Sequence, residues 1–167
     1  ATVRYCDFED CNNGIWASNN GSLFVNSSRF VDCTSRGVLT QRAGVIHIVA
    51  NQFHGSIESA VGCFDANEHL VLRYNTFVSS SKMGTAFAIY VKNGRRIVVT
   101  DNQCWGFRQA VNINGKLERP LLFHRNLIAG SDIGFFLGTK WPAEGKQSGL
   151  LDGNLILGCE TAGLVLD

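Results

Sequence analysis

The chain has 167 residues, of which 45% are hydrophobic and 17% are charged, and its formal net charge at pH 7 is +1. This composition predicts a single domain over residues 1–167 with a buried core. The near-zero charge argues against nucleic acid as a partner, and the lack of a long uncharged apolar run argues against a membrane span. We also expect no signal peptide, because the first residues lack a basic segment followed by an apolar one. Eighteen glycines and only two prolines favour strands and tight turns over helices.

An internal repeat runs through the whole chain, and a large apolar residue marks the same point of each copy. These anchors are spaced 22 to 28 residues apart: Phe8, Phe30, Phe53, Phe77, Cys104, Ile128 and Ile156. A repeat of this length without a helical period predicts about seven coils of a parallel solenoid, in which equivalent residues stack about 4.8 Å apart. A short strand is expected at each anchor.

Another strand is expected just before each anchor, where apolar residues alternate seven and five positions upstream. The expected ranges are 1–3, 23–25, 46–48, 70–72, 97–99, 121–123 and 149–151. Two positions before the anchors stand Cys6, Ser28, Asn51, Asn75, Asn102, Asn126 and Asn154. Because Asn tolerates unusual backbone angles at a bend and its amide can bond the Asn stacked above, this column predicts an internal asparagine ladder.

A further strand follows each anchor after a short loop and begins with Gly or Ala before an apolar residue. The expected ranges are 14–17, 37–40, 60–63, 88–91, 110–113, 134–137 and 163–166. Four Asn-Gly dipeptides would suit the hairpins of a β-sandwich. Hairpins would not place Asn at the same point of every repeat, so the solenoid is the better prediction.

The pattern apolar-x-apolar-x-x-Asn-x-Phe, followed by Gly-Ile or Gly-Val, resembles the right-handed parallel β-helix of the pectin-lyase-like superfamily. The resemblance covers essentially all 167 residues. It implies an all-β fold and a polysaccharide-binding or polysaccharide-processing role outside the cell or at its surface. The superfamily also includes phage tailspikes and adhesins, so the first alternative is a structural or interaction protein.

The resemblance implies that a substrate cleft lies along the strand that begins with Gly-Ile or Gly-Val. The outward residues there are rich in aromatic rings and amides, which suit sugar faces and hydroxyl groups. The candidate substrate-binding residues are Tyr90, Asn112, Asn114, Phe136, Trp141, Trp16 and Phe64. The alternative is that loops or a partner chain cover this aromatic face, as in a tailspike-like or adhesin-like homo-oligomer.

Catalytic groups are sparse on the same face. Enzymes that this pattern resembles carry clustered carboxylates, whereas the clear charge here is Lys92, with Arg108 nearby. Lys92 and Arg108 are therefore the candidate catalytic residues of a metal-independent polysaccharide lyase, the second alternative, and a glycoside hydrolase is the other enzyme class that the resemblance implies. No cofactor or metal site is expected, and calcium is suggested only by analogy with the family.

A second group of polar residues is expected near the end of the strand that precedes the asparagine column. Stacking of the coils should bring five of them together: Arg73, Asp101, His124, Arg125 and Asp152. A histidine between carboxylates can act as an acid or base near neutral pH. The alternative is a ladder of exposed ion pairs, each contributing about 0.2 to 1 kcal/mol.

The six cysteines are expected mainly as buried small hydrophobic residues, with Cys11 and Cys33 the pair most able to form a disulfide. Residues 1 and 167 both fall in strand positions without a polar cap. We therefore expect either a piece of a longer β-helix or ends that another copy covers, which would make a homo-oligomer.

Overall fold

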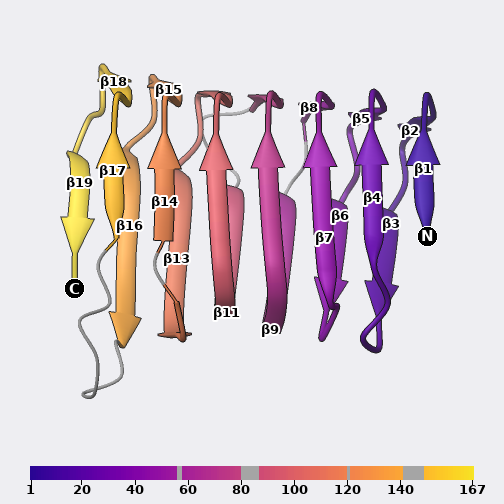
Figure 1. Cartoon of the computed structure of the whole chain (residues 1–167). Helices are drawn as coiled ribbons and strands as arrows, with labels where there is room; N and C mark the ends of the chain where they lie inside the picture. Colours follow the sequence, from indigo (N-terminus) through magenta and orange to yellow (C-terminus); the bar gives the residue numbers. More distant parts are fainter. Residues whose placement is uncertain (56–57, 80–86, 120, 141–148) are drawn as a thin grey trace.

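The computed structural model describes residues 1–55, 58–79, 87–119, 121–140 and 149–167, which form a stack of parallel strands. The N- and C-termini lie at opposite ends of this stack (Figure 1). The chain makes about six turns. The number of coils differs slightly from the prediction, because the seven repeat copies are separated by only six steps along the axis.

The strands make up three faces. The first face contains β1 (Thr2–Arg4), β4 (Leu23–Asn26), β7 (Val45–Val49), the second part of β9 (Ser59–Arg73), the second part of β11 (Phe87–Thr100), β14 (Leu121–His124) and β17 (Leu150–Asp152). The second face contains the anchors, in β2 (Asp7–Glu9), β5 (Arg29–Val31), β8 (Gln52–His54), β10 (Thr76–Val78), β12 (Gln103–Trp105), β15 (Leu127–Ala129) and β18 (Leu155–Leu157). The third face contains β3 (Asn13–Ser18), β6 (Arg36–Gln41), the first parts of β9 and β11, β13 (Gln109–Leu117), β16 (Ile133–Lys140) and β19 (Ala162–Leu166).

Neighbouring strands on each face pair in parallel and in the register that the repeat predicts. Phe53 in β8, for example, lies between Phe30 and Phe77 of the adjoining coils. Strands β9 and β11 turn the corner between the third and first faces without interruption, which joins these two faces into one 12-stranded sheet. The residues sharing a position in the repeat are therefore vertical neighbours, which is the basis of every site described below.

The phenylalanine anchors form a continuous stack in the core. The ring centroids of Phe8 and Phe30 are 4.8 Å apart, those of Phe30 and Phe53 are 4.6 Å apart, and those of Phe53 and Phe77 are 5.0 Å apart. Three of the four rings are buried almost completely. The sequence alternation thus produces a core in which each coil adds one aromatic ring to the same column.

The stack explains why the third-face strands begin with a small residue. A Cβ atom added to Gly37 would lie 2.7 Å from Cδ1 of Phe53 and 2.9 Å from the carbonyl oxygen of Ala60. A Cβ atom on Gly14 would lie equally close to Phe30. The glycine therefore lets the backbone approach the edge of the anchor ring, where a larger side chain would overpack the core.

The asparagine ladder is present, as predicted. Asn51, Asn75, Asn102 and Asn126 each donate from Nδ2 to the Oδ1 of the next Asn, over 2.9 to 3.1 Å. The same Nδ2 atoms also donate to backbone carbonyls of the preceding coil. The ladder therefore satisfies buried backbone groups at every bend, which would otherwise cost about 1 to 3 kcal/mol each.

The structure corrects the explanation for Asn at this bend. The left-handed backbone conformation belongs to the residue before each member of the asparagine column, and not to Asn itself. These residues, with φ between 49° and 61°, are Tyr5, Ser27, Ala50, Tyr74, Asp101, Arg125 and Gly153. At five of the seven next positions, Asn supplies the hydrogen bonds that hold the bend after this left-handed residue.

No helix occurs in the described ranges, and therefore none that is long and apolar enough to cross a membrane. All six cysteines lie within those ranges and are free thiols. Cys33, Cys63 and Cys104 are buried, as predicted, whereas Cys6, Cys11 and Cys159 are only half-buried, so burial is confirmed for three of the six cysteines. Burial raises the pKa of the Cys63 thiol to about 12, so it serves as a small hydrophobic core residue rather than as a reactive group.

Candidate binding groove

An open groove of about 500 Å³ crosses four neighbouring strands of the third face, β6, β9, β11 and β13. Its described lining combines aromatic, charged and amide side chains: Arg36, Glu58, Ser59, Phe64, Phe87, Tyr90, Asn112 and Asn114. Because adjacent parallel strands are about 4.8 Å apart, the groove extends about 15 Å across the strands, along the solenoid axis.

Aromatic rings form the floor of the groove. The ring of Tyr90 is 5.3 Å from that of Phe64 and 4.9 Å from that of Phe87, measured between centroids. All three side chains are half-buried. They therefore rest on one another in the coil stack but keep ring surface open to a ligand.

Arg36 closes one end of this aromatic floor. Its guanidinium carbon lies 5.1 Å from the centroid of Phe64, and Nη2 forms an ion pair with Glu58. A Cβ atom on Gly62 would lie 2.8 Å from Cδ of Arg36, so the glycine provides the space in which the arginine crosses the strand. The Nε atom of Arg36 is buried and has no hydrogen-bond partner among the described residues.

Asn112 lies at the other end of the groove, on β13. It is only 6% exposed, and its Nδ2 donates to Oε1 of Gln109 over 2.5 Å. Its Oδ1 is buried without a partner in the described part of the chain. Within the described part of the chain, the groove thus contains a buried acceptor on Asn112 and a buried donor on Arg36 that have no partner. A bound polar ligand or water would supply their missing hydrogen bonds.

The groove contains four of the residues predicted to bind substrate, Tyr90, Asn112, Asn114 and Phe64. Phe136 lies next to Asn112 in the strand register but is not part of the described lining. The remaining two predicted residues are elsewhere. Trp16 is 68% exposed on β3, the strand next to β6, and is not part of the described lining, and Trp141 is outside the described residues.

The two candidate catalytic residues also lie outside the described lining. Lys92 is exposed on β11, between Phe64 and Asn114 in the strand register, and Arg108 is exposed just before β13. Glu58 is the one carboxylate among the described lining residues, and Arg36 already pairs with it. The described groove thus lacks the two facing carboxylates that glycoside hydrolysis requires.

Four lining residues were not predicted from the sequence: Arg36, Glu58, Ser59 and Phe87. Strict alternation would place Arg36 inside the solenoid, because it stands two residues before the inward Val38. The alternation breaks at Gly37, where both Gly37 and Val38 are buried and Arg36 lies outside with its side chain 22% exposed. In the sequence, the small residue at the start of each third-face strand could have indicated that the alternation breaks there.

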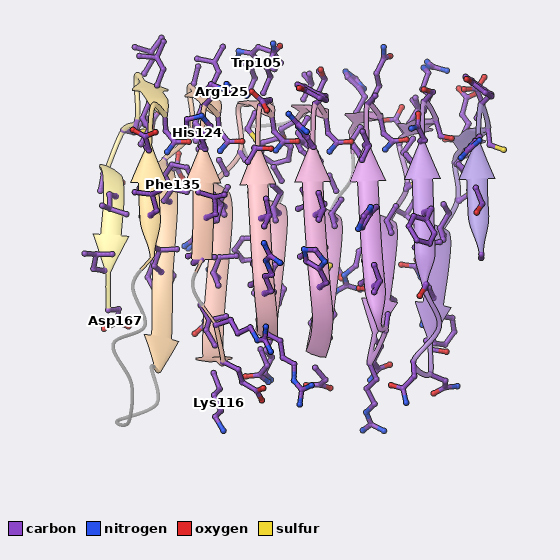
Figure 2. The ribbon with its side chains drawn as sticks, in the orientation of Figure 1. Trp105, Lys116, His124, Arg125, Phe135 and Asp167 are labelled. Atoms are coloured by element: carbon purple, nitrogen blue, oxygen red, sulfur yellow. The ribbon has the colours of Figure 1, made fainter. Side chains whose placement is uncertain are left out.

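The predicted polar cluster forms on the first face, near the corner where the asparagine ladder lies. Asp101 Oδ1 is 2.7 Å from Nε of Arg125, and Asp101 Oδ2 is 3.4 Å from Nε of Arg73. His124 Nδ1 is 2.9 Å from Oδ2 of Asp152. Figure 2 shows His124 and Arg125 at one edge of the solenoid and Lys116 at the opposite edge.

Electrostatics within this cluster favour a structural role. The hydrogen bond from Arg125 is the main cause that lowers the pKa of the Asp101 carboxyl below its usual value, and Arg73 adds to the effect. The arrangement is that of cross-strand ion pairs rather than of a histidine held between two carboxylates. Among the described residues, no three His, Cys, Asp or Glu side chains gather as metal ligands.

A family model described as "Right handed beta helix region" matches residues 1–167. The chain belongs to this family, which confirms the predicted right-handed parallel β-helix. No curated protein and no solved structure was found to match the chain.

Proposed function

We propose that the groove on the third face binds a polysaccharide or oligosaccharide, and that the protein acts outside the cell or at its surface. The observation that carries this proposal is the aromatic floor of Phe64, Phe87 and Tyr90, which lies between two buried polar groups that have no hydrogen-bond partner among the described residues. Aromatic faces stack on the apolar faces of sugar rings. The Nε–H of Arg36 and the Oδ1 of Asn112 can then donate to and accept from sugar hydroxyl groups, directly or through water.

The shape of the groove agrees with a chain-like ligand. It is open and follows the solenoid axis across four strands, so that an extended oligosaccharide can lie over successive coils. Neighbouring coils contribute outward side chains in register, as Tyr90 of β11 and Asn112 of β13 do within the lining. A repeating ligand thus meets a repeating surface, with one contact for each strand that it crosses.

Binding is better supported than catalysis. The described lining offers one carboxylate, Glu58, and its charge is balanced by Arg36. Lys92 and Arg108 remain the candidate catalytic residues of a lyase that works without metal. This hypothesis is tested by incubating the protein with polysaccharide and measuring whether ultraviolet absorbance rises as unsaturated sugar ends form. A Lys92→Ala variant should abolish such a signal if the lyase alternative holds.

The proposal is tested by screening the purified protein against an array of neutral and acidic oligosaccharides, followed by calorimetry. Tyr90→Ala should weaken binding about tenfold, because it removes the central ring of the floor. Tyr5→Ala is the matched control, since Tyr5 is 83% exposed at a corner of the first coil and outside the groove lining. Equal loss in both variants, or no binding by the unmodified protein, would contradict the proposal.

A structural role is the second candidate function. Trp16 is 68% exposed on the same face, on β3, the strand next to β6, and outside the described lining of the groove, which suits an interface with another protein chain. Light scattering distinguishes the two functions. A Trp16→Ala variant that dissociates an oligomer, with no sugar binding in either protein, would favour the structural role.

A further inference from the structure

An arginine-rich patch lies on the first face, away from the groove on the third face. It comprises Arg95 and Arg96 in the second part of β11, Arg119 in the turn before β14, and His69 in β9. A cavity of about 250 Å³ is lined by Val45 and these four residues. The patch is therefore built from three successive coils, so that its positive groups are brought together by the stacking.

A second cavity, of about 330 Å³, adjoins the first one. It is lined by Arg96, Val98, Arg119 and Leu122. Arg96 and Arg119 line both cavities and form their common wall. Half-buried Val98 and Leu122 provide an apolar side to the second cavity, next to the two arginines.

Ion pairs among the described residues involve only one of the three arginines of this patch. Arg95 forms an ion pair with Glu118, with Nε and Oε2 2.8 Å apart. Arg96 and Arg119 are exposed, and neither has an ion pair with a described residue. The pKa of His69 is lowered, mainly by burial and then by electrostatic interaction with Arg96 and His47. Arg96 and His69 line the same cavity, so the positive charge of Arg96 lies close to His69.

We propose that Arg96 and Arg119 bind a tetrahedral oxyanion, a sulfate or phosphate group, at the junction of the two cavities. Guanidinium groups suit such anions because their planar N–H donors bind two oxygens at once. Two arginines on one small surface can hold one anion between them. The apolar wall of Val98 and Leu122 leaves room beside the anion for the carbon skeleton that carries it.

The site is tested by titrating the full chain with sodium sulfate and, separately, with sodium phosphate, while arginine Nε–H signals are followed by NMR. Sodium chloride at matched ionic strength corrects for screening. We expect saturable shifts at Arg96 and Arg119. Arg96→Ala or Arg119→Ala should weaken sulfate binding about tenfold, which corresponds to the loss of one charge-assisted hydrogen bond.

Arg29→Ala is the matched control, because Arg29 is an exposed arginine on the second face. It should leave the sulfate affinity within about twofold of the unmodified protein. Shifts that follow ionic strength alone, or an equal loss in the Arg29 variant, would overturn the proposal. Arg96→Lys should retain charge but lose affinity, since Lys lacks the planar donor pair.

The source of the anion is decided by comparing inorganic sulfate with glucose 6-sulfate. If glucose 6-sulfate binds more tightly than inorganic sulfate, and Leu122→Ala removes this difference in affinity, the site is confirmed and its ligand is a sulfate group carried on a larger molecule. Equal affinity upholds it as a site for the free anion. Because the groove residues play no part here, the outcome is independent of the oligosaccharide tests with Tyr90→Ala.

Discussion

Asn75 is bound to Asn102 of the next coil through two hydrogen bonds to a single oxygen. The Oδ1 atom of Asn102 accepts from the backbone N–H of Asn75 at 2.9 Å and from its Nδ2 at 3.0 Å. The Nδ2 of Asn102 meanwhile donates to the carbonyls of Leu72 and Thr100. One side chain therefore completes the bend of its own coil and fixes its position relative to the coil before it.

Asn102→Ala should destabilise the protein strongly, because it leaves several buried groups without partners. The backbone N–H of Asn75 and the carbonyl of Leu72 would lose hydrogen bonds in a site that water does not reach. We expect the free energy of unfolding to fall by about 3 kcal/mol or more, measured by urea denaturation. Gln103→Ala, at the exposed next position, should change it by less than about 0.5 kcal/mol. If Asn102→Ala lowers the free energy of unfolding as little as the control does, the asparagine ladder does not stabilise the fold as described.

Phe53→Ala should open a cavity in the centre of the aromatic stack. The ring is 2% exposed and lies between Phe30 and Phe77. Truncation should therefore cost about 3 to 5 kcal/mol of unfolding free energy. Phe24→Ala, which removes a ring that is 38% exposed on the first face, should cost only about 1 kcal/mol in the same measurement. Similar costs for the two variants would show that the stack is not the centre of the core.

Gly37→Ala tests the close approach between the third-face backbone and the anchor stack. The added Cβ would lie 2.7 Å from the Phe53 ring, and we expect a cost of about 1 to 3 kcal/mol from overpacking. Gly21→Ala is the control, because the Cβ atom added there would lie 3.7 Å from its nearest neighbour, the carbonyl oxygen of Ser18. Thermal unfolding should show a lower Tm only for the Gly37 variant. An unchanged Tm would mean that the strand can move away from the ring at no cost.

Asp101 should contribute to stability in a pH-dependent way. Its folded-state pKa lies below the usual value of 3.8, mainly because of the hydrogen bond from Arg125. The contribution is therefore fully present above about pH 4 and is lost as the pH falls through the lowered folded-state pKa. Asp101→Asn should lower stability near pH 7 and flatten the acid limb of the stability curve.

The control for Asp101 is Arg125→Gln, which removes the main donor while the carboxyl remains. It should move the acid limb toward higher pH, and the double variant should show less than the sum of the two losses. Strictly additive losses at pH 7 would indicate that the ion pair contributes nothing.

The fold was predictable because each strand type occupies a fixed place in the repeat. The spacing of Phe30, Phe53 and Phe77 predicts that they stack, and the structure places them in register. The same reasoning predicted that Asp101 and Arg125 would be neighbours, although they are 24 residues apart in sequence. Because the coils stack, residues that are distant in sequence but share a repeat position become neighbours, and this can be predicted without knowing side-chain conformations.

The groove was only partly predictable, because its borders depend on backbone geometry that alternation does not capture. Arg36 lies outside only because Gly37 and Val38 are both turned inward beside the Phe53 ring. Its course across the strand further depends on Gly62, whose missing side chain leaves the space. The pairing of Arg36 with Glu58 involves two coils and a loop, so neither residue alone indicates the site.

The most direct test of the proposed groove is an NMR titration of the ¹⁵N-labelled protein with short neutral and acidic oligosaccharides. The proposed groove requires saturable shifts of the Asn112 side-chain amide and the Arg36 Nε–H for at least one of these sugars, with Tyr5 unaffected. Shifts confined to another face, or none at saturating sugar, would contradict it.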